Sequence, residues 1–364
     1  KWLDEFAVDV IQGGAGTSTN MNANEVIANR ALEILGHEKG RYDLIHPLNH
    51  VNMSQSTNDV YPTALRLALS FKLDELQREM KKLRSAMTAK GREFSDVIKM
   101  GRTQLQDAVP MTLGQEFDAW AVTIGEDVLR VVEAQSLIRE INMGATAIGT
   151  GLNAHPHYAS LVTELLADYS GVPVVGSQNL VEATQDAGAY VQLSGVLKRV
   201  AVKLSKICND LRLLSSGPRA GLGEINLPRM APGSSIMPGK VNPIIPEVVN
   251  QVAFEVIGND VTVTMAAEAG QLELNAFEPM IAYNLFSSID LLTRACQTLR
   301  ERCVEGITAN REHCRRMVEN SIGLVTALNP ILGYEKSSEI ASEALNSDRS
   351  VYEIVLEKIG RAHV

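Results

Sequence analysis

The sequence predicts a mainly α-helical protein in which a long central helical bundle lies between smaller N- and C-terminal domains. Two observations lead to this fold class. Apolar residues recur at alternating spacings of three and four over long stretches, which is the spacing of a helix face buried in a bundle. Hydrophobic residues make up 45% of the 364 residues and charged residues 21%. This balance is typical of a soluble globular chain and too interrupted by charge for a membrane span.

The N-terminal domain is expected to occupy residues 1–56. A run of small and polar residues at 13–24 leads into a helical pattern from Glu25 to Leu35, and Gly36 fits a C-terminal cap. No strand pattern precedes the run and no Walker lysine follows it, so a nucleotide-binding loop is not indicated. The irregular segment 37–58 then ends in a second polar cluster.

The central domain, residues 57–310, carries the repeating apolar pattern in four or five long helices. Pro62 is expected in the first turn of the first helix, where its missing N–H costs nothing, and Asn58 or Asp59 is expected to cap that helix. Helices this long rarely persist alone, so we expect an oligomer. The positions expected to face the bundle are Leu65, Leu69, Leu73, Leu76, Met80, Leu83 and Met87; Leu113, Phe117, Trp120, Ile124, Val128 and Val131; Tyr190, Leu193, Leu197, Val200, Leu204, Ile207, Leu211 and Leu214; Val248, Val252 and Val256; and Ile281, Leu285, Ile289, Leu292, Cys296, Leu299 and Cys303.

Residues 311–364 predict a small helical C-terminal domain. Shorter amphipathic pieces span 338–345 and 351–359, and Asn329, Pro330 and Gly333 interrupt the pattern before them.

Charge and cysteine content exclude several classes of function. The formal net charge of −9 and the pI near 5.4 argue against a nucleic-acid partner, because phosphate binding needs a basic face. The N-terminal residues show no signal or transit pattern, so the expected location is the cytoplasm. No cysteine spacing indicates a metal site, and buried reduced thiols are expected at Cys208, Cys296, Cys303 and Cys314.

The stretch Gly233–Pro243 is the strongest functional signal in the chain. It interleaves Ser234, Ser235, Lys240 and Asn242 with glycines and prolines, which make a loop both tight and well defined. Hydroxyls, backbone N–H groups and one cation can then converge on a carboxylate. Three further polar clusters, at residues 17–24, 54–59 and 101–107, fall beside expected helix ends, where helix dipoles favour anions.

Gly233–Pro243 resembles the signature loop of the aspartase/fumarase superfamily, and the resemblance covers essentially the whole chain. It implies elimination chemistry that releases fumarate, in a homotetramer whose active sites each combine three subunits. It assigns proton abstraction from the substrate's β-carbon to Ser234 and names Lys240 as the second catalytic residue. The substrate-binding residues that it implies are Thr17, Ser56, Thr57, Asn58, Thr103, Gln104, Ser235 and Asn242.

The implied reaction builds charge on one substrate carboxylate, through an aci-carboxylate intermediate, before the leaving group departs. Donors aimed at that carboxylate, with Lys240, Asn242 and Thr103 the expected ones, would supply much of the rate. A free serine is a poor base. Ser234 therefore needs a lowered pKa, which the backbone N–H groups of residues 236–237 and the Lys240 charge can provide.

Gln104 favours the aspartases over the fumarases. Fumarases of the superfamily place a histidine there and pair it with a glutamate that matches Glu273. Glutamine does not titrate, so that pair cannot manage a water proton. The resemblance thus implies deamination of L-aspartate, with no required cofactor; it leaves divalent-metal activation open and identifies no metal ligands. Fumarate hydratase is the first alternative, and an inactive structural homologue or a fragment is the second, because the chain starts late and stops early compared with the family.

Overall fold

The structure is a computed structural model that describes residues 2–231, 233, 236–237, 239–347 and 349–359. Contacts divide the chain into two compact units. The first unit comprises residues 1–79, 126–202 and 251–294, and the second comprises residues 80–125, 203–250 and 295–364. The predicted division into domains at 1–56, 57–310 and 311–364 stays a prediction.

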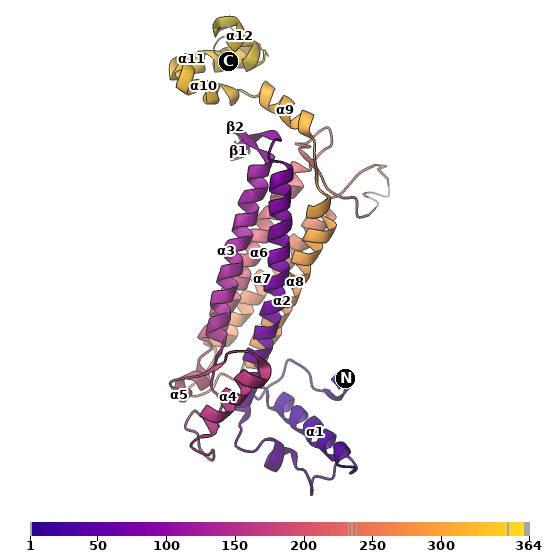
Figure 1. Ribbon diagram of the computed structural model, residues 1–364, viewed down its shortest axis with the longest axis vertical. Helices are drawn as coiled ribbons and strands as arrows, with labels where there is room; N and C mark the ends of the chain where they lie inside the picture. The colour runs from indigo at the N-terminus through magenta and orange to yellow at the C-terminus, as the bar shows by residue number, and fades with distance from the viewer. Residues whose placement is uncertain (1, 232, 234–235, 238, 348, 360–364) are drawn as a thin grey trace. The chain divides into compact units, whose positions relative to one another are not determined.

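The described residues are mainly helical, as predicted (Figure 1). The helices are α1 Thr17–Ile34, α2 Thr57–Glu93, α3 Leu113–Ile138, α4 Tyr158–Ser170, α5 Leu180–Gln185, α6 Gly188–Leu214, α7 Ile244–Glu268, α8 Glu278–Arg302, α9 Arg311–Asn320, α10 Leu324–Leu332, α11 Tyr334–Ser347 and α12 Val351–Ile359, with short helical turns η1 Leu3–Glu5, η2 Pro47–Val51 and η3 Val304–Gly306. The strands are β1 Ile98–Thr103, β2 Gln106–Thr112, β3 Glu140–Ile141, β4 Val175–Gly176, β5 Ile225–Asn226 and β6 Thr308–Ala309.

Within each unit, segments of α2, α3, α6, α7 and α8 lie side by side (Figure 1). Every apolar position predicted to face the bundle on α2, α3, α6 and α8 is buried. In the first unit, polar pairs also join neighbouring helices: the Asn259 amide donates to Ser288 Oγ at 3.1 Å, and Ser194 Oγ donates to Asp260 at 2.8 Å. The bundle is thus held by apolar seams with a few satisfied polar links.

The predicted seam of α7 is wrong for two of its three positions. Val256 is buried, but Val248 is 43% exposed and Val252 is half-buried; Val249, Ala253 and Val263 are buried with Val256. The periodicity could not choose the face, because α7 is apolar almost all round. Its other face leaves Phe254, Val261 and Met265 more than half exposed. A helix with two apolar faces is typical of a fully buried position.

The first helix begins earlier than predicted. It starts at Thr17 rather than Glu25, after Gly16 in the left-handed conformation with φ 88°. Serine, threonine and asparagine favour turns, which is why the run looked like a loop. Asn20 and Asn24 lie buried in this helix, and both amides donate to Asn52. Tertiary contacts therefore override the local preference.

The second unit contains the antiparallel hairpin β1–β2 and the C-terminal helices α9 to α12. Hairpin pairing runs from Ile98 opposite Thr112 to Thr103 opposite Gln106. Helices α10 to α12 enclose a small core of their own that includes Val325, Ile340, Val351, Ile354 and Val355. All four cysteines are free and buried, as expected. None of the described helices is long and apolar enough to cross a membrane.

Candidate active site

Four segments carry the predicted site residues, two in each unit. In the first unit, Thr17 opens α1, and its hydroxyl donates to the Gly14 carbonyl at 2.7 Å. One turn later, the Asn20 amide donates to Thr57 Oγ1 at 2.9 Å. The first turn of α1 is therefore tied to the first turn of α2, and the structure brings together the first two clusters that the sequence singled out.

Ser56 is the N-cap residue of α2, where Asn58 or Asp59 was predicted. Asp59 lies three residues further on and hydrogen-bonds back to Ser56. Ser56 Oγ accepts from the Asn58 N–H at 3.2 Å, and Asp59 Oδ1 accepts from the Ser56 N–H at 2.9 Å. This reciprocal arrangement is a capping box with aspartate in the third position. The hydroxyl and amide side chains of Thr57 and Asn58 consequently lie on the first turn of a helix, where an anion is favoured.

Asp59 also fixes a distant loop to this helix end. Its carboxylate is fully buried, and its Oδ2 accepts from the N–H groups of Gly144 and Thr146 at 3.2 and 2.8 Å. Burial raises the pKa of Asp59, and the hydrogen bonds from backbone N–H groups oppose that rise. Sequence reasoning named Asp59 only as a cap and missed this role.

Pro62 lies in the second turn of α2 and not, as predicted, in the first, so its missing N–H leaves the Asn58 carbonyl without its helical partner. The Asn142 amide supplies the missing donor at 2.9 Å. The Asn58 amide in turn donates to the Ala147 carbonyl at 2.7 Å. Asn142 was not predicted; the only sequence signal is its place just before the polar, glycine-rich run at 144–153.

In the second unit, Thr103 and Gln104 lie at the tip of the β1–β2 hairpin, and both are exposed. Gln104 and Leu105 form a two-residue turn with φ of 53° and 63°. Such a type I′ turn favours glycine or asparagine, so each of these residues is strained by about 1 kcal/mol or more. Strained residues of this kind cluster at functional sites.

The signature loop lies in the second unit. Ser234 and Ser235 lie outside the described residues, so the structure does not test their roles. Gly233 packs so tightly against the Lys240 carbonyl that a side chain there would overlap it at 1.6 Å. The Asn242 amide donates to the Gly233 carbonyl at 2.6 Å. The two ends of the loop are therefore clamped together, and only glycine fits at the first end.

Lys240 and Asn242 line a small pocket of about 160 Å³ together with Ser215, Asn226 and neighbouring residues. Lys240 is exposed, and among the described residues its ammonium group forms no ion pair. A lysine ammonium that forms no ion pair within the described residues can bind a carboxylate of a ligand. In the described part of the chain, no hydrogen bond joins Thr103 or Gln104 to Lys240 or Asn242.

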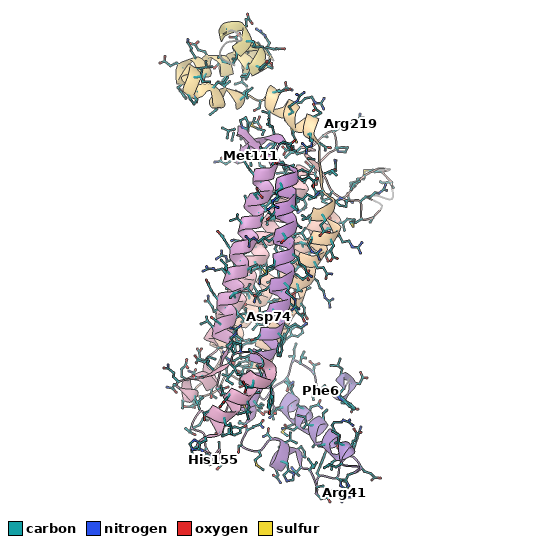
Figure 2. All side chains as sticks on the ribbon, in the orientation of Figure 1. Phe6, Arg41, Asp74, Met111, His155 and Arg219 are labelled. Carbon is teal, nitrogen blue, oxygen red and sulfur yellow. The ribbon has the colours of Figure 1, made fainter. Side chains whose placement is uncertain are left out.

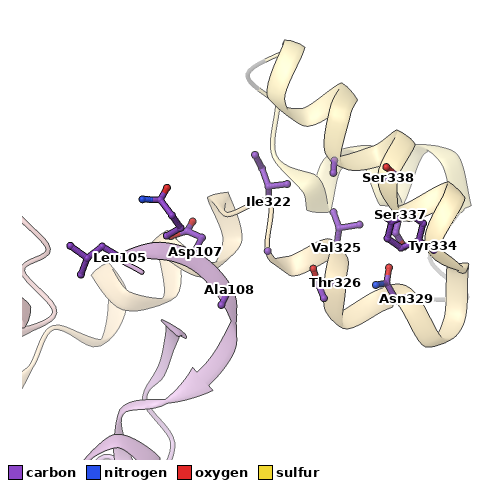
Figure 3. A pocket seen from close by; sticks show the side chains of 13 residues that line it. Leu105, Asp107, Ala108, Ile322, Val325, Thr326, Asn329, Tyr334, Ser337 and Ser338 are labelled. Atoms are coloured by element: carbon purple, nitrogen blue, oxygen red, sulfur yellow. The ribbon is translucent and has the colours of Figure 1, made fainter. Parts of the chain in front are cut away.

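A larger pocket of about 690 Å³ lies between the hairpin and the C-terminal helices of the second unit. Figure 3 shows Asp107 and Ala108 on one side of it and Val325, Thr326 and Asn329 on the other. None of the eight predicted site residues that the structure describes lines it. Pocket size alone would therefore select a different place from the one that the sequence predicts.

His155, His157 and His313 are not among the predicted site residues. His155 (Figure 2) and His157 are exposed in the loop that leads into α4. His313 Nε2 lies 2.8 Å from the Leu222 carbonyl oxygen. Glu273 is exposed in a tight turn where Gln271 and Leu274 pair. In the described ranges, no group of three or more His, Cys, Asp or Glu residues is placed to hold a metal ion.

Comparisons with protein-family models identify the family of the chain. Residues 1–258 match a family model described as a lyase, and residues 324–359 match one described as the fumarase C C-terminus. The chain therefore belongs to the lyase family of aspartases and fumarases.

Relatives within the family are more specific. Aspartate ammonia-lyase from Helicobacter pylori (strain ATCC 700392 / 26695) is 65% identical over 358 residues, which cover 98% of this chain and 76% of that protein. Aspartate ammonia-lyase from Pseudomonas fluorescens is 64% identical over 356 residues, covering 98% and 74%. Within the family, the chain groups with the aspartate ammonia-lyases, which are carbon–nitrogen lyases.

Two solved structures share the fold. A fumarate lyase:delta crystallin from Brucella melitensis bound to cobalt is 62% identical, with a TM-score of 0.95 and coverage of 98% of this chain and 77% of that one. A class II fumarase from Schistosoma mansoni is 36% identical, with a TM-score of 0.92 and coverage of 98% and 78%. These matches confirm the predicted fold class.

Proposed function

We propose that this protein catalyses the reversible deamination of L-aspartate to fumarate and ammonia. The observation that carries the proposal is Gln104 at the hairpin tip, where fumarases of the superfamily carry a histidine. A glutamine amide can orient a carboxylate or an amino group but cannot shuttle a proton, which suits an amine leaving group better than water. The names of the 57–65% identical relatives support the same reaction.

In the proposed mechanism, Ser234 takes a proton from the β-carbon, and the electron pair is delocalised into the adjacent carboxylate. Lys240, Asn242 and Thr103 stabilise the resulting aci-carboxylate. As that intermediate collapses, the carbon–carbon double bond forms, the Cα–N bond breaks and ammonia leaves with the electron pair of that bond. The exposed ammonium of Lys240, which forms no ion pair within the described residues, and the clamped loop ends support this assignment. Ser235 joins Lys240 and Asn242 as a carboxylate ligand.

The other carboxylate is proposed to bind at the starts of α1 and α2. Thr17, Ser56, Thr57 and Asn58 provide hydroxyl and amide groups there. Thr103 and Gln104 complete the active site from a hairpin tip, with Thr103 donating to the aci-carboxylate. The capping box and the positive end of the α2 dipole make this end of the helix suited to an anion.

We further propose a homotetramer whose active sites combine segments from different subunits. Two features support it. On one face of α7, Phe254, Val261 and Met265 are 65, 56 and 67% exposed in the single chain. Burying such an apolar face against another subunit lowers the free energy strongly. The predicted site residues also fall on helix starts in one unit and on a hairpin and a loop in the other.

We also propose that the enzyme requires no cofactor and is located in the cytoplasm. Cobalt is named for the Brucella melitensis structure.

Substitution of Ser234 tests the proposal. Ser234→Ala is expected to lower kcat with L-aspartate by about 10²- to 10⁴-fold, the usual contribution of a positioned acid–base group. Ser85→Ala is the matched control, because Ser85 is an exposed serine on α2 that donates to the Lys81 carbonyl. A Ser234→Ala tetramer with near-normal kcat would rule out the serine mechanism.

A further inference from the structure

Four charged side chains gather beneath the β1–β2 hairpin of the second unit. Lys99 is 2% exposed and Glu224 is fully buried. Lys99 Nζ lies 2.5 Å from Glu116 Oε2 and 2.9 Å from Glu224 Oε2. The Arg102 guanidinium donates to the other oxygen of Glu224. Two cations and two carboxylates balance, which is what a buried ionic cluster requires.

Hydrogen bonds hold the backbone of Glu224 through both its N–H group and its carbonyl group. Glu224 follows α6, and its N–H donates to the Leu214 carbonyl at 2.9 Å. Its own carbonyl accepts from the Asn310 N–H at 2.9 Å and from Cys314 Sγ at 3.6 Å. The adjacent Gly223 carbonyl accepts from the Asn310 amide at 2.7 Å. The carboxylate of Glu224 is thus presented from a fixed support.

The partners on either side of Glu224 lead to predicted site residues. Arg102 immediately precedes Thr103, so its ion pair holds the last residue before the strained hairpin tip. On the other side, the residues after Glu224 form β5, and Asn226 lines the same pocket as Lys240 and Asn242.

We propose that Glu224 is a positioning residue, which sets the hairpin tip bearing Thr103 and Gln104 through its buried ion pair with Arg102. This inference rests on the proposed function, because it takes Thr103 and Gln104 as substrate-binding residues. Glu224 does not touch the substrate. It holds in place a turn whose two left-handed residues would otherwise relax to less strained conformations.

The cluster offers its own control. Glu116 contacts Lys99 but not Arg102, so Glu116→Gln disturbs the same buried charges without releasing the hairpin tip. Glu224→Gln removes the negative charge opposite Arg102, so among the described residues Arg102 keeps at most a neutral amide oxygen there, beside the Met100 carbonyl at 3.3 Å and Met317 Sδ at 3.8 Å. The double variant Glu224→Gln/Arg102→Met removes both partners and leaves no unpaired arginine, so it keeps the test available should Glu224→Gln fail to fold.

The test compares these variants as purified oligomers by two readouts. The first is KM for L-aspartate together with Kd for succinate, a saturated dicarboxylate that cannot undergo the elimination. We expect Glu224→Gln and the double variant to raise both by about tenfold or more, and Glu116→Gln to change them less than about threefold. The second is hydrogen exchange of residues 98–112, which should be faster around the tip only in the variants that lose Glu224.

The proposal would be overturned if Glu224→Gln and Glu116→Gln changed KM, Kd and hydrogen exchange at the tip equally. It would also be overturned if Glu224→Gln lowered the stability of the protein but left KM, Kd and exchange at the tip unchanged. The exchange readout does not depend on activity. If the wild-type protein did not act on L-aspartate, the proposed function would fail, while a selective loosening of the tip would still support the positioning role of Glu224.

Discussion

Replacing Asp59 by asparagine is the sharpest perturbation of the α2 helix start. The wild-type carboxylate is fully buried and accepts three backbone hydrogen bonds, from Ser56 to one oxygen and from Gly144 and Thr146 to the other. Burial raises the pKa of Asp59, so the negative charge is not what stabilises this site. The loss in the variant comes from the hydrogen bonds.

An asparagine side chain has one oxygen, so it can accept either from the Ser56 N–H or from the Gly144 and Thr146 N–H groups, but not from both sets. At best it keeps the bonds to Gly144 and Thr146 and turns an N–H group toward the Ser56 N–H. An orphaned buried donor costs about 1 to 3 kcal/mol, and we expect Asp59→Asn to lower the free energy of unfolding by about 2 kcal/mol.

The assay is urea unfolding at one fixed protein concentration and pH, because oligomer stability depends on concentration. Asp186→Asn is the control: Asp186 accepts one exposed bond, from the Gly188 N–H at 2.9 Å, and should cost less than about 0.5 kcal/mol. If Asp59→Asn unfolds at the same urea concentration as the wild type or Asp186→Asn, the reasoning on this helix start is refuted.

Three further predictions follow from the same contacts. Burial raises the pKa of Glu278 from 4.5 to about 8, against the opposing charge of Arg66. The contribution of Glu278 to the free energy of unfolding is therefore full below pH 4.5 and is lost as the pH rises through 8, by roughly 4 to 5 kcal/mol at most. Glu278→Gln should flatten the fall in the urea midpoint between pH 5 and 9. Gly233→Ala should abolish turnover while leaving the oligomer folded, because the new side chain meets the Lys240 carbonyl; a variant with normal kcat would contradict the clamp. Lys240→Ala and Thr57→Val, each inactive alone, should regain part of the wild-type activity when their subunits are mixed by refolding; no recovery would contradict sites shared between subunits.

Sequence predicted the bundle well because long apolar seams leave few alternatives. Leu69, Leu73 and Leu76 on α2 are fully buried, as their spacing requires. The same rule failed on α7, where Val248 and Val249 are both apolar and only packing decides which is buried. Periodicity identifies a helix but cannot choose between two apolar faces.

The hairpin and the polar scaffold of the site could not be predicted in the same way. Leu105 adopts a left-handed conformation that its side chain disfavours, so local preference gave no signal for the turn. Asn142 and Asp59 act on segments more than eighty positions away in the chain. The sequence reasoning could name the groups that meet a substrate, because their order resembles a known family, but not the side chains that hold them.

The central claim is that the leaving group is ammonia and not water. The most direct measurement follows the ultraviolet absorbance of fumarate after the purified wild-type protein is mixed with L-aspartate or, separately, with L-malate. Fumarate that forms from L-aspartate and not from L-malate is the result we predict. Fumarate formed only from L-malate would contradict the proposed function and make the protein a hydratase built on the same fold.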